Sequence, residues 1–433
     1  MHDPVCLLQR LIQFDTTNPP GNERELIEFV QAVCHGAGLE TDLLAKVPER
    51  PNLIARLPGR GLAPPLLLYG HADVVTTHGQ TWAHPPFAAQ IADDCVWGRG
   101  AIDMKGGLAM MIAAILRLRQ QSWQPAGDLL LAVVSDEEAG GNVGARFLVE
   151  EHADRFAGVQ YALGEFGGFP LRIAGKTFYM VQVAEKESLC LRARVTGPGG
   201  HGAFPMRGGA MARAGRLLTR LDRAALPIHV IPVVEQMIAS VADELPLLHR
   251  TVLRQLLHRR RAPTVLRLLG STGKTFEPLL RNTANATTIH GGRKHNVIPS
   301  RIDIGLDARI LPGFTPDDLI DEMKSILGDD AKYQTMLHDP GPAEVDLGLF
   351  GHLSEALRTQ DPEALVVPLL LPATTDARFF SRIGIQSYGF TPMNSVPGGS
   401  FFDIVHAANE RIPVDALRFG TAVMTTALAE YGR

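Results

Sequence analysis

The sequence predicts an α/β fold, a mostly parallel sheet with helices on both faces, interrupted by a smaller inserted α+β domain. The first observation is a set of predominantly apolar runs at 52–57, 66–70 and 129–135, which alternate with helical patterns as buried parallel strands do. The second is a change near Lys186, where a strand-like alternation replaces these runs. The α/β pattern resumes at about 344, so the smaller domain interrupts the larger one.

The larger domain is expected at 1–187 and 344–433. Apolar spacing predicts helices at 4–14 and 23–36, separated by the helix-breaking segment TTNPPGNE. A helix rich in small residues is predicted to begin after Asp103, with two glycines at its start. In open α/β sheets, functional side chains gather just past the carboxyl ends of the strands, so that edge of the sheet is the expected place for a site.

The inserted domain is expected at 188–343. Its pattern is strand, helix, strand, helix, strand, with a helix at about 208–223 and another over TPDDLIDEMKSIL, for which Thr315 is the predicted N-cap. A helical insert at about 235–275 carries the basic run HRRR at 258–261. We interpret this run as a solvated helix face.

The composition is that of an ordinary globular protein. Of 433 residues, 45% are hydrophobic and 20% are charged. The net charge of −4 argues against a nucleic-acid partner, which requires a concentrated basic surface. Four scattered cysteines indicate neither a disulfide framework nor a thiolate zinc site, so we expect a cytoplasmic protein. No apolar stretch resembles a signal peptide or a membrane span, and no membrane partner is expected.

Three clusters of acidic and histidine residues follow or adjoin predicted strands: GHADVV at 70–75, GRGAIDMKGG at 98–107 and SDEEAGG at 135–141. Their imidazole and carboxylate groups are ligands suited to a pair of divalent cations. Glycines in each cluster permit the tight turns that such a site needs. The ordered set indicates a hydrolase with two metal ions.

Each side chain has an expected place in such a centre. Asp103 is short and bidentate, which suits a bridge between two ions. His71 is expected to bind one ion through a ring nitrogen, while Asp73 holds the other ring nitrogen. Glu137 and Glu138 are adjacent and point in different directions, so one can bind metal while the other reaches a water molecule.

These ordered motifs resemble the family of acetylornithine deacetylase, succinyl-diaminopimelate desuccinylase, aminoacylase and carboxypeptidase G, which are co-catalytic zinc metallopeptidases. The resemblance covers nearly the whole chain. It implies two Zn²⁺ ions per subunit, with Co²⁺ or Mn²⁺ as alternatives. His71 then binds one zinc and Asp103 bridges the two. Glu137 is the implied general base, and Glu138 the implied ligand of the second zinc.

The same resemblance implies two further ligands, Glu165 in ALGEFGG and His406 in FFDIVHAANERI. A Glu at the place of Glu165 goes with acylases and carboxypeptidases more than with aminopeptidases. The resemblance also implies a non-proline cis peptide after Asp103. Finally, it implies that the inserted domain is a lid or dimerisation domain, and that the protein is a homodimer.

Other residues resemble the family's contacts to substrate. His201 in GPGGHGAFP resembles a histidine that reaches the partner subunit's site and stabilises the tetrahedral oxyanion. Polar side chains and backbone N–H groups are expected to hold the substrate and its carboxylate. The residues concerned are Asn296, Arg309, Asp376, Arg378, Gly398 and Gly399.

We therefore expect a hydrolase that cleaves the amide bond of an N-acyl amino acid, or a C-terminal peptide bond beside a free carboxylate. The expected nucleophile is a water molecule shared by the two metal ions and activated by Glu137. One alternative is an aminopeptidase for di- or tripeptides on the same scaffold, and another is a metal-binding scaffold without catalysis. The segment GSTGKT at 270–275 does not predict a phosphate loop, because Leu268 stands where the first glycine is required.

Overall fold

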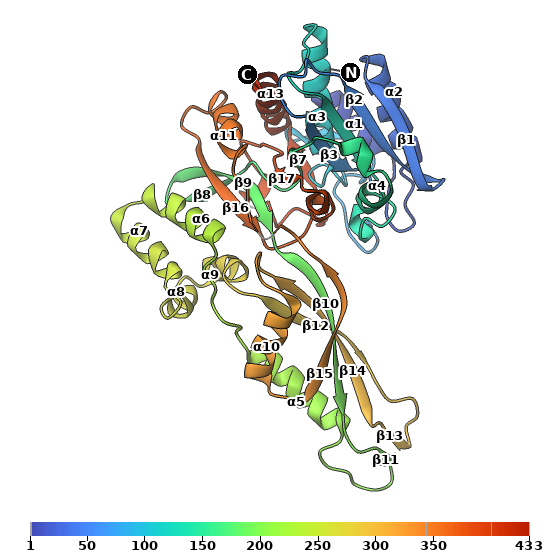
Figure 1. Ribbon diagram of the computed structural model, residues 1–433, viewed down its shortest axis with the longest axis vertical. Coiled ribbons are helices and arrows are strands. Elements are labelled where there is room, and N and C mark those ends of the chain that lie inside the picture. Colours follow the sequence, from blue (N-terminus) through green and yellow to red (C-terminus); the bar gives the residue numbers. More distant parts are fainter. Residues whose placement is uncertain (1, 343, 400, 433) are drawn as a thin grey trace. The chain divides into compact units, whose positions relative to one another are not determined.

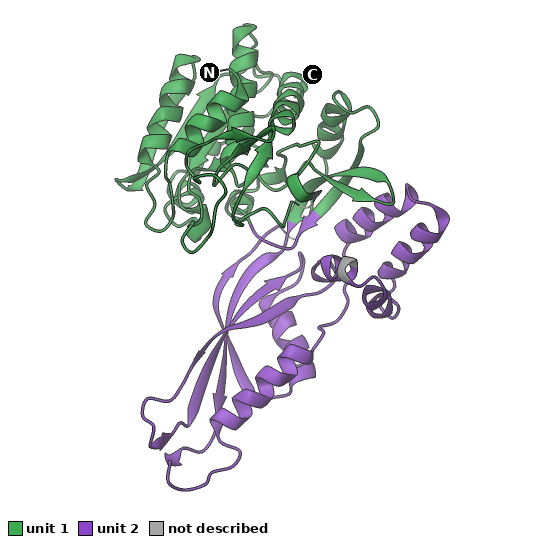
Figure 2. Cartoon of the chain, turned by 180° about the vertical axis from the view of Figure 1, so that it is seen from behind, with its two compact units in different colours: residues 1–184, 345–369, 375–433 green, residues 185–344, 370–374 purple. Residues whose placement is uncertain are grey.

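The computed structural model describes residues 2–342, 344–399 and 401–432, which form two compact units. Unit 1 consists of the described residues of 1–184, 345–369 and 375–433, and unit 2 of those of 185–344 and 370–374 (Figure 2). Each unit therefore contains segments that are far apart in the sequence. No pattern in the sequence indicated that 370–374 joins unit 2.

Unit 1 is built on a sheet of nine strands among the described residues, in the order β1-β2-β6-β3-β7-β17-β9-β16, with β8 beside β9. The central strands β6, β3, β7 and β17 are parallel, which confirms the predicted fold class, while the pairs β1–β2, β2–β6 and β9–β17 are antiparallel. The strands are β1 (Glu40–Val47), β2 (Arg50–Leu57), β3 (Leu66–His71), β6 (Leu129–Val134), β7 (Tyr161–Gly164), β8 (Phe169–Ile173), β9 (Lys176–Glu185), β16 (Leu365–Leu371) and β17 (Gln386–Gly389). A small sheet joins β4 (Ile91–Ala92), β5 (Cys95–Trp97) and β18 (Arg411–Pro413).

Helices cover both faces of this sheet (Figure 1). Alternate residues of each buried strand face opposite sides. Leu67 and Tyr69 of β3 belong to a core with α4 and α12, whereas Gly70 lies against Met104 and Leu108 beside α3. The helices are α1 (Pro4–Gln13), α2 (Arg24–Gly36), α3 (Lys105–Gln120), α4 (Ala145–Glu151), α11 (Phe350–Arg358), α12 (Ala377–Phe380) and α13 (Val414–Glu430). The helices predicted at 4–14, 23–36 and after Asp103 are all present.

Unit 2 contains an antiparallel four-stranded sheet in the order β12-β14-β10-β15. Along β14 the burial alternates strictly, because one face packs against α5 and α10 and the other is more exposed. Thr315 caps α10, as predicted, by accepting a hydrogen bond from the Asp318 backbone N–H. The elements are β10 (Glu187–Thr196), β11 (Gly200–His201), α5 (Ala210–Arg223), β12 (Thr283–His290), β13 (Val297–Ile298), β14 (Arg301–Ile310), α10 (Pro316–Leu327) and β15 (Ala331–Asp339).

The helical insert of unit 2 lies between α5 and β12. It consists of α6 (Pro232–Asp243), α7 (Leu247–Arg254), α8 (Ala262–Leu268) and α9 (Ser271–Phe276). Its inward-facing apolar residues, such as Ile238, Leu256 and Leu266, are buried. Across the part of the chain that the structure describes, no helix combines the length and the apolar character needed to cross a bilayer.

Candidate metal centre and active site

Neighbouring parallel strands place three of the predicted side chains at one edge of the sheet. His71 is the last residue of β3, Glu165 directly follows β7, and the turn Glu137–Ala139 follows β6. Because β6, β3 and β7 are adjacent and parallel, their carboxyl ends meet at the same edge. The apolar runs determine where these strands form, and the polar residues that directly follow the strands therefore lie close together at that edge.

Asp103 lies between two sets of ligand atoms. Its Oδ1 is 3.0 Å from His71 Nε2, and its Oδ2 is 3.2 Å from His406 Nε2. The first set is completed by Glu165, whose Oε2 is 3.3 Å from His71 Nε2. The second is completed by Glu138, whose Oε2 is 3.2 Å from His406 Nε2. One aspartate thus offers one oxygen to each of two sets of three ligands.

Glu137 lies beside the first of these sets. One of its carboxylate oxygens lies within 4.8 Å of a ligand atom of His71 and of Glu165. The guanidinium of Arg378 approaches the same carboxylate, with Nη1 3.7 Å from Oε1. Asp376 is buried nearby, and both of its carboxylate oxygens lack a hydrogen-bond partner among the described residues.

The electrostatics of the centre are dominated by buried carboxylates. Burial raises the pKa of Glu137 well above its usual range, and the nearby Glu165 and Asp376 raise it further. Burial likewise raises the pKa of Glu165 to about 8. Hydrogen bonds to Asp103 and Glu138 raise the pKa of His406 to about 10. Burial therefore disfavours the ionised forms of Glu137 and Glu165 in the protein alone, and a bound cation would favour these ionised forms.

The residues fit a pair of metal ions. The ligand atoms are imidazole nitrogens and carboxylate oxygens, the set that Zn²⁺, Co²⁺ or Mn²⁺ accepts. Glu138 Oε1 is buried without a hydrogen-bond partner in the described part of the chain, which is costly unless a cation or another donor meets it. The ligand atoms of His71, Asp103 and Glu138 also lie within 4.8 Å of one another, so the two ligand sets that share Asp103 adjoin each other.

Asp73 holds the centre differently from our expectation. The ring Nδ1 of His71 lies 2.9 Å from the backbone carbonyl of Asp73, whereas the carboxylate is 3.7 Å away. That carboxylate instead accepts hydrogen bonds from the backbone N–H groups of Glu137 and Glu138, both at 3.1 Å. The path of the chain explains this arrangement. The turn after β6 brings two backbone N–H donors to the Asp73 carboxylate, while the backbone carbonyl of Asp73 is the group that contacts Nδ1 of His71.

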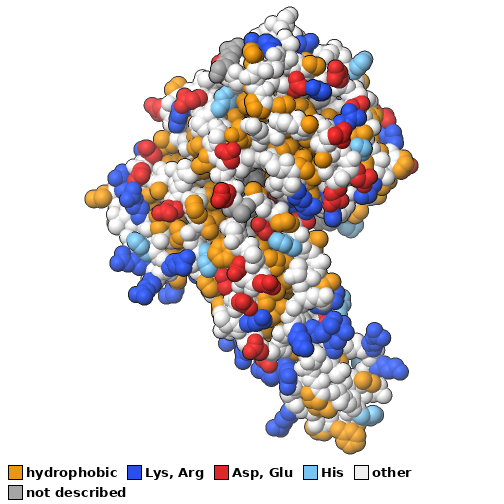
Figure 3. Space-filling view, viewed as in Figure 1, with side chains coloured by type: hydrophobic (Ala, Val, Ile, Leu, Met, Phe, Trp, Pro, Cys, Tyr) orange, Lys and Arg blue, Asp and Glu red, His pale blue; other side chains and the backbone are white. Residues whose placement is uncertain are grey.

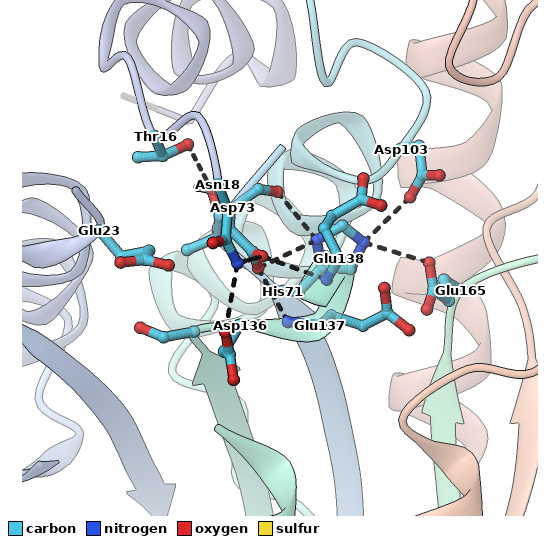
Figure 4. A network of polar contacts seen from close by, with 12 residues as sticks. Thr16, Asn18, Glu23, His71, Asp73, Asp103, Asp136, Glu137, Glu138 and Glu165 are labelled. Carbon is cyan, nitrogen blue, oxygen red and sulfur yellow. Dashed lines mark hydrogen bonds and ion pairs between the residues drawn. The ribbon is translucent and has the colours of Figure 1, made fainter. Parts of the chain in front are cut away.

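A buried polar network behind Asp73 was missed by the sequence interpretation. Figure 4 shows Asn18 beside Asp73 and Asp136. The Asn18 side-chain amide donates to both carboxylates, at 2.8 and 3.3 Å. Arg50 pairs with Asp136 at 3.0 Å and with Glu23. Asn18 and Glu23 lie in the segment TTNPPGNE. Its prolines and glycine led us to interpret the segment only as a helix break, and the role of its polar side chains was therefore missed.

Glu410 is a second residue that the sequence interpretation missed. It is fully buried and pairs with Arg99 at 2.6 Å. Its carboxylate also accepts hydrogen bonds from the backbone N–H groups of Gly100, Ile102 and Asp103. Arg99 in turn donates to the backbone carbonyl of His406. Glu410 therefore ties the loop that carries Asp103 to the segment that carries His406.

Three other predicted site residues, His201, Asn296 and Arg309, belong to unit 2. His201 and Asn296 are close together in unit 2, where His201 pairs with Val297 and the Gly202 N–H donates to the Asn296 carbonyl. Strand β14 begins at Arg301, shortly after Asn296 in the chain, and Arg309 lies eight positions further along it, roughly 25 Å away at the rise of a strand. The side chain of Arg309 donates a hydrogen bond to Thr374. Unit 2 by itself thus does not bring Arg309 to the other two. The metal-ligand cluster lies entirely in unit 1 and forms without these three residues.

Two further backbone features involve predicted residues of unit 1. The Asp103–Met104 peptide is cis, as the resemblance implied. Gly398 and Gly399 lie in the short turn Pro397–Gly399 of unit 1, in which Gly398 has a φ of 72°.

Comparisons with known proteins agree with this geometry. The profile of Peptidase family M20/M25/M40 matches residues 67–430. "Probable carboxypeptidase S-like 2" of Dictyostelium discoideum is 28% identical over 363 residues, which cover 81% of this chain and 68% of that protein. An N-fatty-acyl-amino acid synthase/hydrolase of Mus musculus is 29% identical over 364 residues, with 81% and 71% covered. The crystal structure of an M20 family metallo-carboxypeptidase from Sulfolobus solfataricus matches over 100% of both chains, with a TM-score of 0.68 and 17% identity. The chain belongs to peptidase family M20/M25/M40 and is a metal-dependent hydrolase of amide or peptide bonds.

Proposed function

We propose that the protein hydrolyses the amide bond of N-acyl amino acids, or C-terminal peptide bonds beside a free carboxylate, with two zinc ions bound per subunit. The observation that carries this proposal is the position of Asp103, which offers one oxygen to the His71–Glu165 set and the other to the His406–Glu138 set. A shared carboxylate between two ligand sets is the arrangement that two-metal hydrolases use.

In this proposal Glu137 is the general base. Bound zinc would supply a Lewis acid for the amide carbonyl and lower the pKa of the attacking water. Glu137 takes a proton from that water and passes it to the leaving amine. Asp73 supports this role because its carboxylate fixes the backbone of Glu137 and Glu138. Arg378 stands close enough to hold the Glu137 carboxylate in place.

The substrate class is supported by what the named relatives share. A carboxypeptidase and an N-fatty-acyl-amino acid hydrolase both release an amino acid that carries a free carboxylate. We propose that the substrate is a small peptide or an N-acyl amino acid, and that its polar contacts include Asp376, Arg378, Gly398 and Gly399. For unit 2 we propose His201, Asn296 and Arg309 as further contacts.

A homodimer and a cytoplasmic location are part of the proposal. The edge strand β12 is exposed over most of its length, and Ile289 on it is 56% exposed. Phe204 and Val297, near His201, are also exposed, which supports an interface on the inserted unit. All four cysteines are free thiols, as expected in a reducing compartment. Sedimentation equilibrium of the protein tests the dimer.

The first test changes the proposed base. Glu137→Gln removes the basic oxygen but keeps the shape of the side chain, so kcat should fall on the order of 10³-fold. Metal content, measured by mass spectrometry, should stay at two ions per chain. The exposed Glu363 provides a matched control, and Glu363→Gln should keep wild-type kinetics. A Glu137→Gln enzyme with more than a tenth of wild-type kcat would contradict the assigned role.

The second test identifies the substrate. Metal-free protein is reconstituted with Zn²⁺, Co²⁺ or Mn²⁺ and assayed against N-acyl amino acids and against dipeptides with a free amine. We expect N-acyl amino acids, or peptides blocked at the amine, to give the higher kcat/KM. Faster cleavage of free-amine dipeptides would establish an aminopeptidase instead. No hydrolysis with any metal would leave a metal-binding scaffold.

A further inference from the structure

The helical insert of unit 2 contains a segment of one charge sign, which we name the basic segment. Residues 245–276 include no Asp or Glu, but six arginines, one lysine and two histidines. The whole chain carries a net charge of −4, so this concentration is not a property of the protein at large. The segment covers α7, α8 and α9 and the turns between them.

The cations of the basic segment are solvent-exposed and largely uncompensated. Arg259, Arg260 and Arg267 are exposed, and Figure 3 shows Lys and Arg side chains gathered along the outer edge of the insert. Among the residues that the structure describes, Arg254 pairs with Asp243, and no other cation of the segment takes part in an ion pair. A solvated helix face usually mixes both signs, so this one attracts an anionic partner.

Large exposed apolar side chains neighbour these cations along the sequence. Leu247, Leu248 and Leu268 are 77%, 73% and 81% exposed. The helical insert already has a core that includes Leu256 and Leu266, so these three leucines are not needed to hold it together. Exposure of these leucine side chains to water costs free energy. Their transfer to an apolar environment recovers that free energy.

From these observations we propose that the basic segment docks reversibly on the surface of an anionic lipid bilayer. Lipid phosphates meet the arginines, while Leu247, Leu248 and Leu268 enter the region between headgroups and acyl chains. A nucleic acid would satisfy the cations but offer no apolar phase to the leucines, so the bilayer is the better partner. We therefore replace two expectations from the sequence, that the basic run at 258–261 is only a solvated helix face and that the protein has no membrane partner. Membrane docking of the basic segment does not depend on the proposed hydrolysis.

The test is co-sedimentation of the full-length protein with large unilamellar vesicles. One vesicle population is phosphatidylcholine alone, and the other is phosphatidylcholine and phosphatidylglycerol in equal parts. We expect binding to the second only, weakened by added salt because salt screens the exposed charges. Substituting Arg259, Arg260 and Arg267 together by Gln should lower the partition coefficient roughly 100-fold. Substituting Leu247, Leu248 and Leu268 by Ser should lower it roughly tenfold per leucine.

The matched control removes three exposed arginines of unit 1, with Arg60, Arg172 and Arg418 changed to Gln. It should bind anionic vesicles as the wild type does, and every variant should keep the wild-type Tm. Equal binding to neutral vesicles would overturn the proposal, as would an equal loss in the control. Binding to heparin or RNA without binding to anionic vesicles would also overturn it and would assign the basic segment to a polyanion.

Discussion

Asp73 shows at the scale of single residues how the centre is held. Its buried carboxylate accepts three hydrogen bonds, two from the backbone of the Glu137–Glu138 turn and one from Asn18. A carboxylate with this many donors has its orientation fixed, and it fixes the donors in return. The proposed base and one metal ligand are therefore placed by a residue that need not touch substrate.

Asn18 is the residue that tests this support. Asn18→Ala removes the amide between the carboxylates of Asp73 and Asp136, so the free energy of unfolding should fall by about 1–3 kcal/mol. We expect kcat to fall about 10- to 100-fold because the turn that carries Glu137 is less well held. Denaturant unfolding and steady-state kinetics measure the two effects.

The charged isostere sharpens this prediction. Asn18→Asp keeps the shape of the side chain but places a third carboxylate beside Asp73 and Asp136. It should be less stable than Asn18→Ala at neutral pH, because like charges in a buried site repel. If both variants match the wild type in stability and kcat, the network has no positioning role.

Lys186 predicts a pH dependence of stability. Its ammonium is buried in unit 2, where it donates to the carbonyls of Pro278 and Arg281 and to Thr283. Burial, with a smaller contribution from Arg309, lowers the pKa of Lys186 to about 7, against about 10.4 in an unfolded chain. Between these values the unfolded state binds more protons, so this group makes the free energy of unfolding rise with pH. Below about pH 7 its destabilising effect is fully present and constant.

Lys186→Met should therefore flatten the rise in the free energy of unfolding between pH 7 and pH 9.5, measured by urea denaturation. The lost hydrogen bonds should lower stability equally at every pH, so they displace the curve without changing its slope. The exposed Lys324→Met serves as the control and should keep the wild-type slope. An unchanged slope in Lys186→Met would show that the amine does not titrate in this range.

At the scale of elements, Glu410 joins two segments that each carry a metal ligand. It binds the loop before α3 through three backbone N–H groups and Arg99 through a buried ion pair. Glu410→Gln leaves the Arg99 charge uncompensated, so the free energy of unfolding should fall by about 3 kcal/mol. Metal affinity should fall about 10- to 100-fold, because Asp103 and His406 are less well oriented.

Isothermal titration with Zn²⁺ and thermal denaturation measure these effects of Glu410→Gln. The exposed pair of Glu355 and Arg358 gives the comparison, and Glu355→Gln should cost less than about 1 kcal/mol. Wild-type metal affinity in Glu410→Gln would show that the ligand segments hold their positions without this tie.

The elements that the sequence predicted are those that bury an apolar face. The runs at 66–70 and 129–135 became β3 and β6, because strands buried on both faces have continuous apolar side chains. Several strands escaped prediction. Two of them, β1 and β12, lie at sheet edges and are largely exposed, whereas the buried strands β7 and β17 are short, spanning only Tyr161–Gly164 and Gln386–Gly389. An edge strand buries few side chains, so its periodicity does not stand out in the sequence.

At the scale of the whole molecule, the two units should respond differently to metal removal. The candidate ligands all belong to unit 1, where carboxylates crowd one another when no cation is bound. Bound metal stabilises the folded state of that unit by about 4 kcal/mol at a thousand times Kd. Chelation should therefore lower the Tm of unit 1 and leave unit 2 unchanged.

Hydrogen exchange followed by mass spectrometry reads this difference unit by unit. Peptides from β3, β6 and α3 should lose protection on chelation, while peptides from β10 and β14 should keep theirs. Restored protection after addition of Zn²⁺ shows that the loss is reversible. A uniform loss of protection across both units would contradict a centre confined to unit 1.

The sequence by itself determined the fold class, the metal-ligand types and their order along the chain. These features are encoded locally, in apolar periodicity and in short motifs such as GHADVV and SDEEAGG. Even Glu165 and His406, proposed only through family resemblance, lie within 3.3 Å of a ligand partner.

Only the tertiary structure decided how these groups face one another. It directed the two oxygens of Asp103 to different histidines and turned the Asp73 carboxylate toward the Glu137–Glu138 backbone. It also joined Asn18 to Asp136, and Glu410 to the loop of Asp103, across 118 and 307 positions of sequence. Contacts of such separation depend on the path of the whole chain, for which local periodicity carries no signal.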